Sequence, residues 1–501
     1  MFNRSDPARQ ALLLAFKATS TLAAFLLLSQ LTMLAHAQPS AQLVWGECAA
    51  RAPGEAPLCG TLHVPERRNE PDSTRLSLPF VILPALSPDP APDPVVFLTG
   101  GPGYSALSTV TRWTEVRALR EGRDVIIVEQ RGNGTAIPAL TCPQVRDARN
   151  RFDTSALEAC RERLEQRGIH LDAYNSSAVA ADLADLRNVL GLEEWNVFGT
   201  SYGTTVALTL LREHPQGIRS VVLDSPFPPQ ANAFDAFAAA GLNALGALFG
   251  ACEAQPDCHE AYPNLKGKFT SATESLNARP IQVQGRTIDG RALYEFLFNA
   301  LYDTSRLPNV PLAVHAAANG DIEMVLELLA VVPDLPPGIP PDRVLVQGSY
   351  LSVFCQEEFP YAKPVDWPLA TTEEWSSPVQ AAARFSMLQN RRACEVWGVP
   401  PAPPSVAQPV WSEVPTLVLA GEFDPVTPPL LAKWTLSTLP NATLLVAPAT
   451  GHAVVVSPFS LPPEQTACPA YVTASFLDNP ERPLDLSCVA DMPSVDFVVE
   501  P

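Results

Sequence analysis

The chain has 501 residues, of which 47% are hydrophobic and 17% are charged, so it can bury a large core. Its formal net charge is −19, from 53 acidic and 34 basic residues. This balance argues against a nucleic-acid partner, because nucleic-acid binding normally requires a basic face. The composition is that of a globular protein.

The N-terminus has the pattern of a secretory signal. Three basic residues precede the apolar run TLAAFLLLSQLTML at residues 21–34: Arg4, Arg9 and Lys17. Small residues follow, and we expect signal peptidase to cut between Ala37 and Gln38. A membrane anchor is the alternative, but the run is shorter than the ~20 residues that span a bilayer. We therefore expect a secreted or periplasmic protein with no stable membrane anchor, and we find no other run long enough to cross a membrane.

The ten cysteines agree with export, because disulfides form in oxidising compartments. Connectivity cannot be read from sequence alone. Pairing neighbours in chain order gives five short loops outside the expected strands: Cys48 with Cys59, Cys142 with Cys160, Cys252 with Cys258, Cys355 with Cys394, and Cys468 with Cys488. Free buried thiols are the alternative. The sequence has no C-x-x-C or H-E-x-x-H spacing, so we expect no metal. No cofactor is implied either.

Short apolar runs that end in glycine-rich turns or lead into helices predict the strands of a sheet. They lie at residues 74–85, 94–105, 123–134, 195–203, 218–226, 415–429 and 442–452. Fully apolar strands that alternate with helical stretches indicate a mostly parallel sheet with helices on both faces. Ligands of such sheets bind at the carboxyl ends of the strands, where these turns lie.

The pattern changes between the fifth and sixth of these strands. Apolar residues recur there at three- and four-residue spacing, which predicts helices at residues 232–251, 291–303 and 322–332, and strand signals are absent. We interpret this region as a helical lid inserted into an α/β domain. The expected organisation is a signal peptide at 1–37, a first core part at 38–226, a lid at 227–409 and a second core part at 410–501.

The stretch WNVFGTSYGTTVALTL, residues 195–210, places a G-x-S-x-G pattern between an apolar strand and a helix. A strand, this pattern and a helix form a nucleophile elbow, in which a tight turn exposes the serine hydroxyl. We expect Ser201 to be a nucleophile and the N–H of Tyr202 to face the oxyanion. A serine in an ordinary glycine-rich loop is the alternative.

A nucleophilic serine needs a base and an acid that orients it, in the chain order serine, acid, histidine. His452 follows a strand and a glycine near the end of the chain, and Asp424 follows the strand before it. Glu422 competes with Asp424 but lies nearer the strand. The alternatives are a surface histidine and a turn-forming Asp-Pro pair. We expect the triad Ser201, Asp424 and His452.

A second oxyanion donor should come from the loop after an earlier strand. The segment FLTGGPGYS supplies Gly100 and Gly101 at that point. We choose the N–H of Gly101, because a glycine lets the backbone approach a carbonyl closely. A plain turn is the alternative.

Several motifs together resemble the α/β-hydrolase branch of prolyl iminopeptidases and secreted tripeptidyl aminopeptidases. They are Gly100-Gly101-Pro102-Gly103, Gln130-Arg131-Gly132-Asn133-Gly134, the elbow around Ser201, GEFDPVTPP and the Gly-His pair. The resemblance spans roughly Cys48 to the C-terminus and is thin inside the lid. It implies an α/β-hydrolase fold and an exopeptidase that acts on free N-termini.

The resemblance also implies lid acids that hold the ammonium group of the substrate. Glu357 and Glu358, beside Cys355, match this role, and a solvated acidic turn is the alternative. The chain departs from the family where Glu129 replaces Asp, Ala136 replaces Ser and Thr99 replaces His. These departures put a preference for proline in doubt. Arg131 is expected to anchor a loop.

The sequence therefore predicts an exported serine hydrolase that acts on a short peptide or small acyl substrate through an acyl-enzyme. An aminopeptidase is the favoured activity. A carboxylesterase or lipase with the same triad is the first alternative, because the elbow cannot separate amide from ester hydrolysis. A non-catalytic binding protein on a hydrolase scaffold is the second.

Overall fold

The computed structural model describes residues 41–50, 52, 54–145, 152–329, 340, 343–362, 374–457 and 461–499. The predicted signal peptide and its cleavage site lie outside these residues. Nine strands form one central sheet: β1 (Gln42–Trp45), β2 (Leu58–Pro65), β3 (Arg75–Leu83), β4 (Val95–Leu98), β5 (Val125–Val128), β6 (Trp195–Thr200), β7 (Ile218–Asp224), β10 (Thr416–Gly421) and β11 (Ala442–Ala447).

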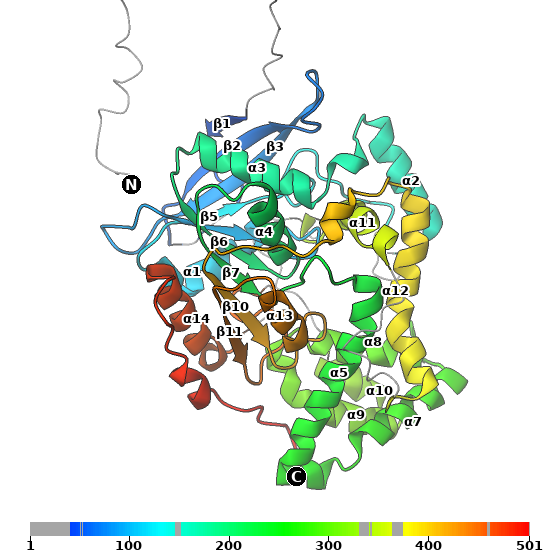
Figure 1. The fold of residues 1–501 in the computed structure, drawn as a ribbon. Coiled ribbons are helices and arrows are strands. Elements are labelled where there is room, and N and C mark those ends of the chain that lie inside the picture. The colour runs from blue at the N-terminus through cyan, green and yellow to red at the C-terminus, as the bar shows by residue number, and fades with distance from the viewer. Residues whose placement is uncertain are drawn as a thin grey trace, which may run out of the picture.

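The sheet is mostly parallel, as expected. The strand order is β1-β2-β3-β5-β4-β6-β7-β10-β11 (Figure 1). The six strands from β5 to β11 in this order run parallel, whereas β1, β2 and β3 pair antiparallel with their neighbours and with β5. The parallel strands β6, β7, β10 and β11 lie side by side, so the loops after them meet at one edge. This edge carries all three expected triad residues.

The helices are α1 (Val110–Glu115), α2 (Thr154–Gln166), α3 (Ser176–Val189), α4 (Tyr202–Glu213), α5 (Ala233–Ala254), α6 (Pro256–Ala261), α7 (Leu265–Ala278), α8 (Gly290–Ala300), α9 (Val310–Ala318), α10 (Ile322–Leu329), α11 (Gln347–Glu357), α12 (Ser377–Trp397), α13 (Pro429–Leu436) and α14 (Pro463–Asp478). Short 3-10 helices add turns between them, among them η6 (Thr304–Asn309).

Alternation along the strands separates two apolar layers. Successive side chains of a strand point to opposite faces of the sheet. Val96 and Leu98 of β4 therefore join the layer covered by α3, α4 and α13, whereas Val95 and Phe97 join the layer covered by α1 and α14. The central strands are buried on both faces, which explains why they read as continuous apolar runs in the sequence.

Between β7 and β10 the helices of the described chain are joined by loops, and one hairpin of two short strands occurs, β8 (Ile281–Val283) with β9 (Arg286–Ile288). The expectation that this region has no strands is therefore wrong. A two-residue turn, Gln284-Gly285, joins them, and both residues have positive φ. Such turns suit the twist of a hairpin, but strands this short give little periodic signal.

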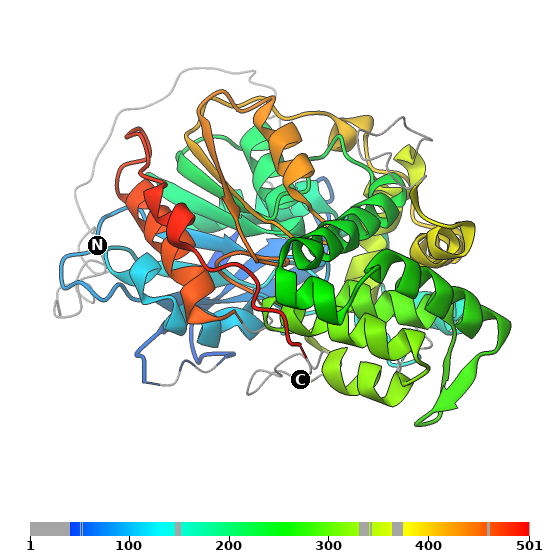
Figure 2. The same ribbon diagram turned by 90° about the horizontal axis from the view of Figure 1, so that it is seen from below.

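The inserted helices divide between two cores. Side chains from α5 and α7–α10 form an apolar cluster of their own, at the lower right of Figure 1, which Figure 2 shows from below. In contrast, α11 and the last turns of α12 pack into the layer over α3 and α4. The expected boundaries of the lid, 227–409, stay a prediction.

Helix α5 has the length and composition of a membrane span, so the expectation that no such run follows the signal is wrong. However, 61% of its most apolar window is buried inside the protein. A helix that is apolar over most of its surface and is covered by neighbouring helices is typical of a large core.

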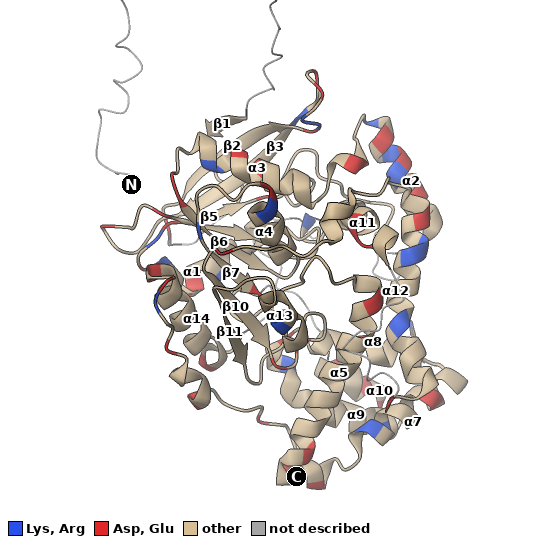
Figure 3. Cartoon of the chain, viewed as in Figure 1, with Lys and Arg blue, Asp and Glu red and all other residues tan. Residues whose placement is uncertain are grey.

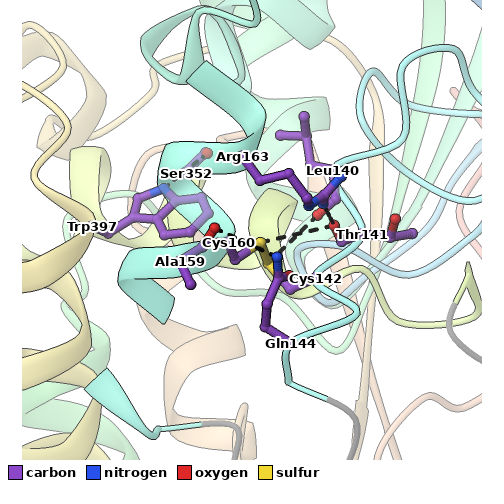
Figure 4. Close-up of a disulfide and its surroundings, with 9 residues drawn as sticks. All are labelled: Leu140, Thr141, Cys142, Gln144, Ala159, Cys160, Arg163, Ser352 and Trp397. Carbon is purple, nitrogen blue, oxygen red and sulfur yellow. Dashed lines mark hydrogen bonds between the residues drawn. A yellow bond between two sulfur atoms is a disulfide. The ribbon is translucent and has the colours of Figure 1, made fainter. Parts of the chain in front are cut away.

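Five disulfides join the ten cysteines in the pairing expected from the sequence: Cys48–Cys59, Cys142–Cys160, Cys252–Cys258, Cys355–Cys394 and Cys468–Cys488. Figure 4 shows Cys142 and Cys160, which attach the loop after β5 to α2. Arg163 of α2 donates to the carbonyl of Thr141 beside this bond. The disulfide and the hydrogen bond hold α2 at the same point of the loop.

Charged side chains of both signs are interspersed on the surface. On α2, arginines and glutamates are interspersed along the helix (Figure 3). One such pair is Arg161 with Glu165, one helical turn apart. The basic residues in this view are scattered among acidic ones.

The disulfides should differ in what they add to stability. Replacing Cys355 and Cys394 with alanine opens a loop of 39 residues, and replacing Cys252 and Cys258 opens one of 6. Loop-closure entropy predicts losses of about 4 and about 2 kcal/mol in the free energy of unfolding. Urea unfolding of the two double variants measures these losses. Equal losses, or a larger loss for the short loop, would contradict the loop-entropy account.

Candidate active site

Ser201 lies in a strained turn between β6 and α4. Its backbone has φ 56° and ψ −124°, a conformation that a residue with a side chain rarely adopts. The N–H of Ser201 donates to the carbonyl of Asp224 at the end of β7, at 2.9 Å. The serine is only partly buried, while the strand before it and the helix after it are almost completely buried. This geometry is that of a nucleophile elbow.

The two glycines of the pattern are required by space. A side-chain carbon on Gly199 would lie 2.4 Å from the carbonyl oxygen of Gly203, and one on Gly203 would lie 2.1 Å from that of Leu98. Any larger residue would force α4 away from β4 and β6. Glycines here let the helix begin directly behind the serine.

Asp424 and His452 form a buried pair. His452 Nδ1 lies 2.8 Å from Asp424 Oδ2, and the two residues are 6% and 0% exposed. The other oxygen, Asp424 Oδ1, accepts hydrogen bonds from the N–H groups of Val426 and Thr427. The hydroxyl of Thr427 donates to Oδ2. The carboxylate is therefore fixed in the orientation that holds the imidazole.

The competing acid, Glu422, faces elsewhere. Its Oε2 accepts from the N–H of Ala449 at 2.9 Å, in the turn that leads to His452. The structure brings Asp424, and not Glu422, onto the imidazole.

Electrostatics in this pair favour a charged histidine. Burial lowers the pKa of His452, but the charge and the hydrogen bond of Asp424, together with the charge of Asp224, outweigh burial and raise this pKa above 6.5. Burial likewise works against ionised Asp424, but the pairing with His452 keeps the pKa of Asp424 below its usual value. Such a pair stabilises an imidazolium when one forms.

Asp224 connects both parts of the site and is not among the residues predicted from the sequence. Its carbonyl holds the N–H of Ser201, while its carboxylate accepts from the N–H groups of Val454 and Val455 at 2.8 and 3.0 Å. The neighbouring Ser225 Oγ accepts from the N–H of Ala453. Asp224 is fully buried, which raises its pKa to about 6. The sequence signal that could have indicated Asp224 is an acidic residue at the end of an apolar strand.

The two expected oxyanion donors have different support. The N–H of Tyr202 lies in the first turn of α4, where a helix offers no acceptor four residues earlier. In the glycine loop, Gly100 contacts the nucleophile: a side-chain carbon there would lie 3.2 Å from Ser201 Oγ. Gly101 follows it with φ 114°. The choice of the Gly101 N–H stays a prediction.

Two residues from the family motif have structural partners. Arg131 forms a two-pronged ion pair with Asp182, so its expected anchoring role is confirmed. Glu129, which stands where the family has Asp, is buried and accepts from Ser105 Oγ and from the N–H of Ala106 and Thr135. Glu129 therefore ties the loop after β4 to the loop after β5.

Glu357 and Glu358 occupy different surroundings at the end of α11. Glu357 is buried, and its two oxygens accept from the N–H and the hydroxyl of Ser176, whose hydroxyl lies 2.9 Å from Tyr202 Oη. Burial raises the pKa of Glu357 to about 7. Glu358 is half-buried, and one of its oxygens accepts from the N–H of Ala233. No hydrogen bond to its second oxygen is found within the described residues.

Comparison with family models identifies the architecture. Residues 93–250 match the model described as alpha/beta hydrolase fold, and residues 378–488 match the model described as TAP-like protein. The first match covers the elbow, and the second covers Asp424 and His452. Together the two matches support the α/β-hydrolase peptidase branch. The predicted fold class and family resemblance are confirmed.

The curated relatives agree with this assignment. The chain is 25% identical to the serine protease Hip1 of Mycobacterium tuberculosis over 500 residues. This alignment covers 89% of this chain and 90% of that protein. The chain is also 29% identical over 174 residues to a probable proline iminopeptidase of Streptomyces coelicolor, covering 35% of this chain and 42% of the relative. The protein is a serine hydrolase related to these enzymes, so the non-catalytic alternative is wrong.

Two solved structures align with most of the chain. A proline iminopeptidase from Mycobacterium smegmatis aligns over 84% of this chain and 98% of its own, with 15% identity and a TM-score of 0.40. An esterase from Thermogutta terrifontis aligns over 84% and 99%, with 16% identity and a TM-score of 0.37.

The charge of Asp224 should act on His452. In Asp224→Asn the side chain keeps one acceptor but loses its negative charge, which helps to raise the pKa of His452, so this pKa should fall. An NMR titration of the His452 ring measures this pKa. Ser225→Ala is the control, because it removes a hydrogen bond from the same turn without changing charge. An unchanged His452 pKa in Asp224→Asn, or an equal fall in the control, would contradict the electrostatic coupling.

Proposed function

We propose that the protein is an exported serine aminopeptidase. In this proposal Ser201 Oγ attacks the scissile carbonyl, while His452 takes the serine proton and returns it to the leaving amine. Asp424 holds the imidazole and stabilises its charged form. Water then releases the acyl group from Ser201. The buried Asp424–His452 pair, whose turn Asp224 links to the strained elbow of Ser201, is the observation that carries the proposal.

The oxyanion of the tetrahedral intermediate is stabilised by backbone donors. Tyr202 supplies one N–H from the first turn of α4, next to the positive end of that helix. Gly101 supplies the second from the loop after β4. The contact between Gly100 and Ser201 supports this, because it brings the glycine loop against the nucleophile.

A free N-terminus of a short peptide is the proposed recognition element. An ammonium group taken out of water needs a carboxylate partner. Glu358 suits this role best, because it is less deeply buried than Glu357 and has an oxygen with no hydrogen bond among the described residues. Glu357 contributes from behind: it fixes Ser176 and through it the ring of Tyr202. The names of the relatives, a serine protease and a proline iminopeptidase, support a peptide substrate.

A carboxylesterase is the second candidate, and one observation favours it. Both oxygens of Glu357 are already engaged by Ser176, so only one of the two expected acids can bind an ammonium group without rearrangement. An ester without a free amine needs neither acid.

Export to a secreted or periplasmic location completes the proposal. The five disulfides support an oxidising compartment, and no free cysteine is found among the described residues. The basic, apolar and small-residue pattern before Gln38 supports a cleaved signal.

A panel of fluorogenic substrates tests the activity. We expect the mature protein to hydrolyse aminoacyl and tripeptidyl amides with a free amine and to fail on the same amides after N-acetylation. Ser201→Ala should lower kcat by at least about 10⁴-fold, as expected when a serine nucleophile is removed. Hydrolysis of a short-chain ester alone, lost in Ser201→Ala, would replace the peptidase proposal with the esterase.

The role of Glu358 can be measured separately. Glu358→Gln keeps the shape and the acceptor for Ala233 but removes the charge, so KM for free-amine amides should rise by about 10- to 100-fold, the equivalent of a lost charge-assisted hydrogen bond. Turnover of a short-chain ester serves as the internal control and should not change. An unchanged KM for the amides would mean that the ammonium group is bound elsewhere.

A further inference from the structure

The turn that carries His452 is strained and needs support from its surroundings. Ala449 and Ala453, which flank the histidine, have φ of 51° and 68°. Such a backbone conformation is unfavourable for a residue with a side chain and persists only where neighbouring structure holds it. Asp224, Ser225 and Glu422 provide this from the α/β core, through the hydrogen bonds described above.

The inserted region holds the same turn from the opposite side. Residues 301–304 follow α8 and enter η6. Thr304 Oγ1 accepts a hydrogen bond from the N–H of Gly451 at 3.1 Å, and both residues are buried. The ring of Tyr302 packs edge-on against the imidazole of His452, with centroids 5.0 Å apart and an angle of 70° between the rings. Tyr302 therefore contacts the histidine itself, and Thr304 binds the residue before it.

The glycine of the Gly-His pair is explained by this contact. Gly451 does not have the positive φ that would require glycine. Instead, a side-chain carbon on Gly451 would lie 2.1 Å from the carbonyl oxygen of Leu301. Glycine at this position therefore permits the backbone of the insertion to lie directly against the turn.

The insertion is also fastened to the core beyond this point. Phe423 and Ala449, from the loops of the acid and the histidine, belong to the apolar cluster of α5 and α7–α10. The tail after α14 crosses to the same helices, as Figures 1 and 2 both show. Val495 and Phe497 of this tail are buried in that cluster, and the N–H of Val498 donates to the carbonyl of Pro308.

We propose that residues 301–304 of the insertion are a positioning element for the catalytic histidine, with Thr304 as its central residue. In this role the insertion completes the support of the His452 turn. Thr304 acts through Gly451 and does not touch the reacting atoms. This inference rests on the proposed role of His452.

Thr304→Val tests the proposal, because it keeps the shape of the side chain and removes the acceptor. We expect kcat for a peptide amide to fall by about 10- to 100-fold, since a displacement of about 1 Å at a catalytic group can cost this much. KM should stay within about twofold, because substrate contacts are unchanged. Thr304→Ser, which keeps the hydroxyl, should retain most of the wild-type kcat.

Thr473→Val is the matched control for general destabilisation. Thr473 is a buried threonine of α14 whose hydroxyl donates to the carbonyl of Pro469, so this variant also loses one buried hydrogen bond. We expect its melting temperature to fall while its kcat does not. If Thr304→Val does not fold, Tyr302→Leu replaces it, because Tyr302 is only partly buried; its kcat should fall at least about threefold, the equivalent of one lost ring contact.

The outcomes separate the inference from the proposed function. A Thr304→Val protein with full kcat, or a Thr473→Val protein with an equal loss, would overturn the positioning role while His452→Ala still abolishes activity. Tyr302→Leu with full kcat would overturn it in the same way. If His452→Ala is itself fully active, the proposed catalytic role fails first.

Discussion

The hydrogen bond between Asp424 and His452 is the interaction on which the rest of the site depends. It joins two buried ionisable groups, and a buried charge is tolerated only when it is paired and hydrogen-bonded. Three further donors from Val426 and Thr427 satisfy the carboxylate. Burial alone would lower the pKa of His452 and raise that of Asp424. The attraction between the two charges outweighs burial, so the pKa of His452 rises and that of Asp424 falls.

The sheet makes this pair possible by bringing distant segments to one edge. The serine follows β6, Asp224 ends β7, and the aspartate and histidine follow β10 and β11, so four neighbouring parallel strands supply the site. Asp224 links them directly, since its carbonyl holds the nucleophile and its carboxylate holds the residues after the histidine. On the other side the insertion supplies Thr304. The turn that carries His452 is therefore supported by the α/β core and by the inserted region.

Much of the fold could be predicted from the sequence because the central strands are buried on both faces and read as apolar runs. The elbow was predictable for the same reason, since Ser201 stands between a recognisable strand and helix. The pairing of Asp424 with His452 could be expected from chain order. The hairpin of β8 and β9 could not, because three-residue strands carry almost no periodicity.

Other features depend on tertiary contacts that leave no local signal. Thr304 is an ordinary threonine in the sequence, and only the fold brings it to Gly451. The engagement of Glu357 by Ser176 likewise could not be foreseen, because α3 and α11 are far apart along the chain. The pair Glu357-Glu358 reads as two similar acids. Glu357 is buried with both oxygens on Ser176 at the start of α3, whereas Glu358 is only partly buried and uses one oxygen on Ala233 at the start of α5.

The central claim is that Ser201 is a nucleophile activated by the Asp424–His452 pair. Labelling the native protein with a fluorophosphonate, followed by peptide mass spectrometry, tests it most directly. The account predicts one adduct, on the peptide that contains Ser201, and its loss when His452 is replaced by alanine. No adduct, or an adduct on a different serine, would contradict it.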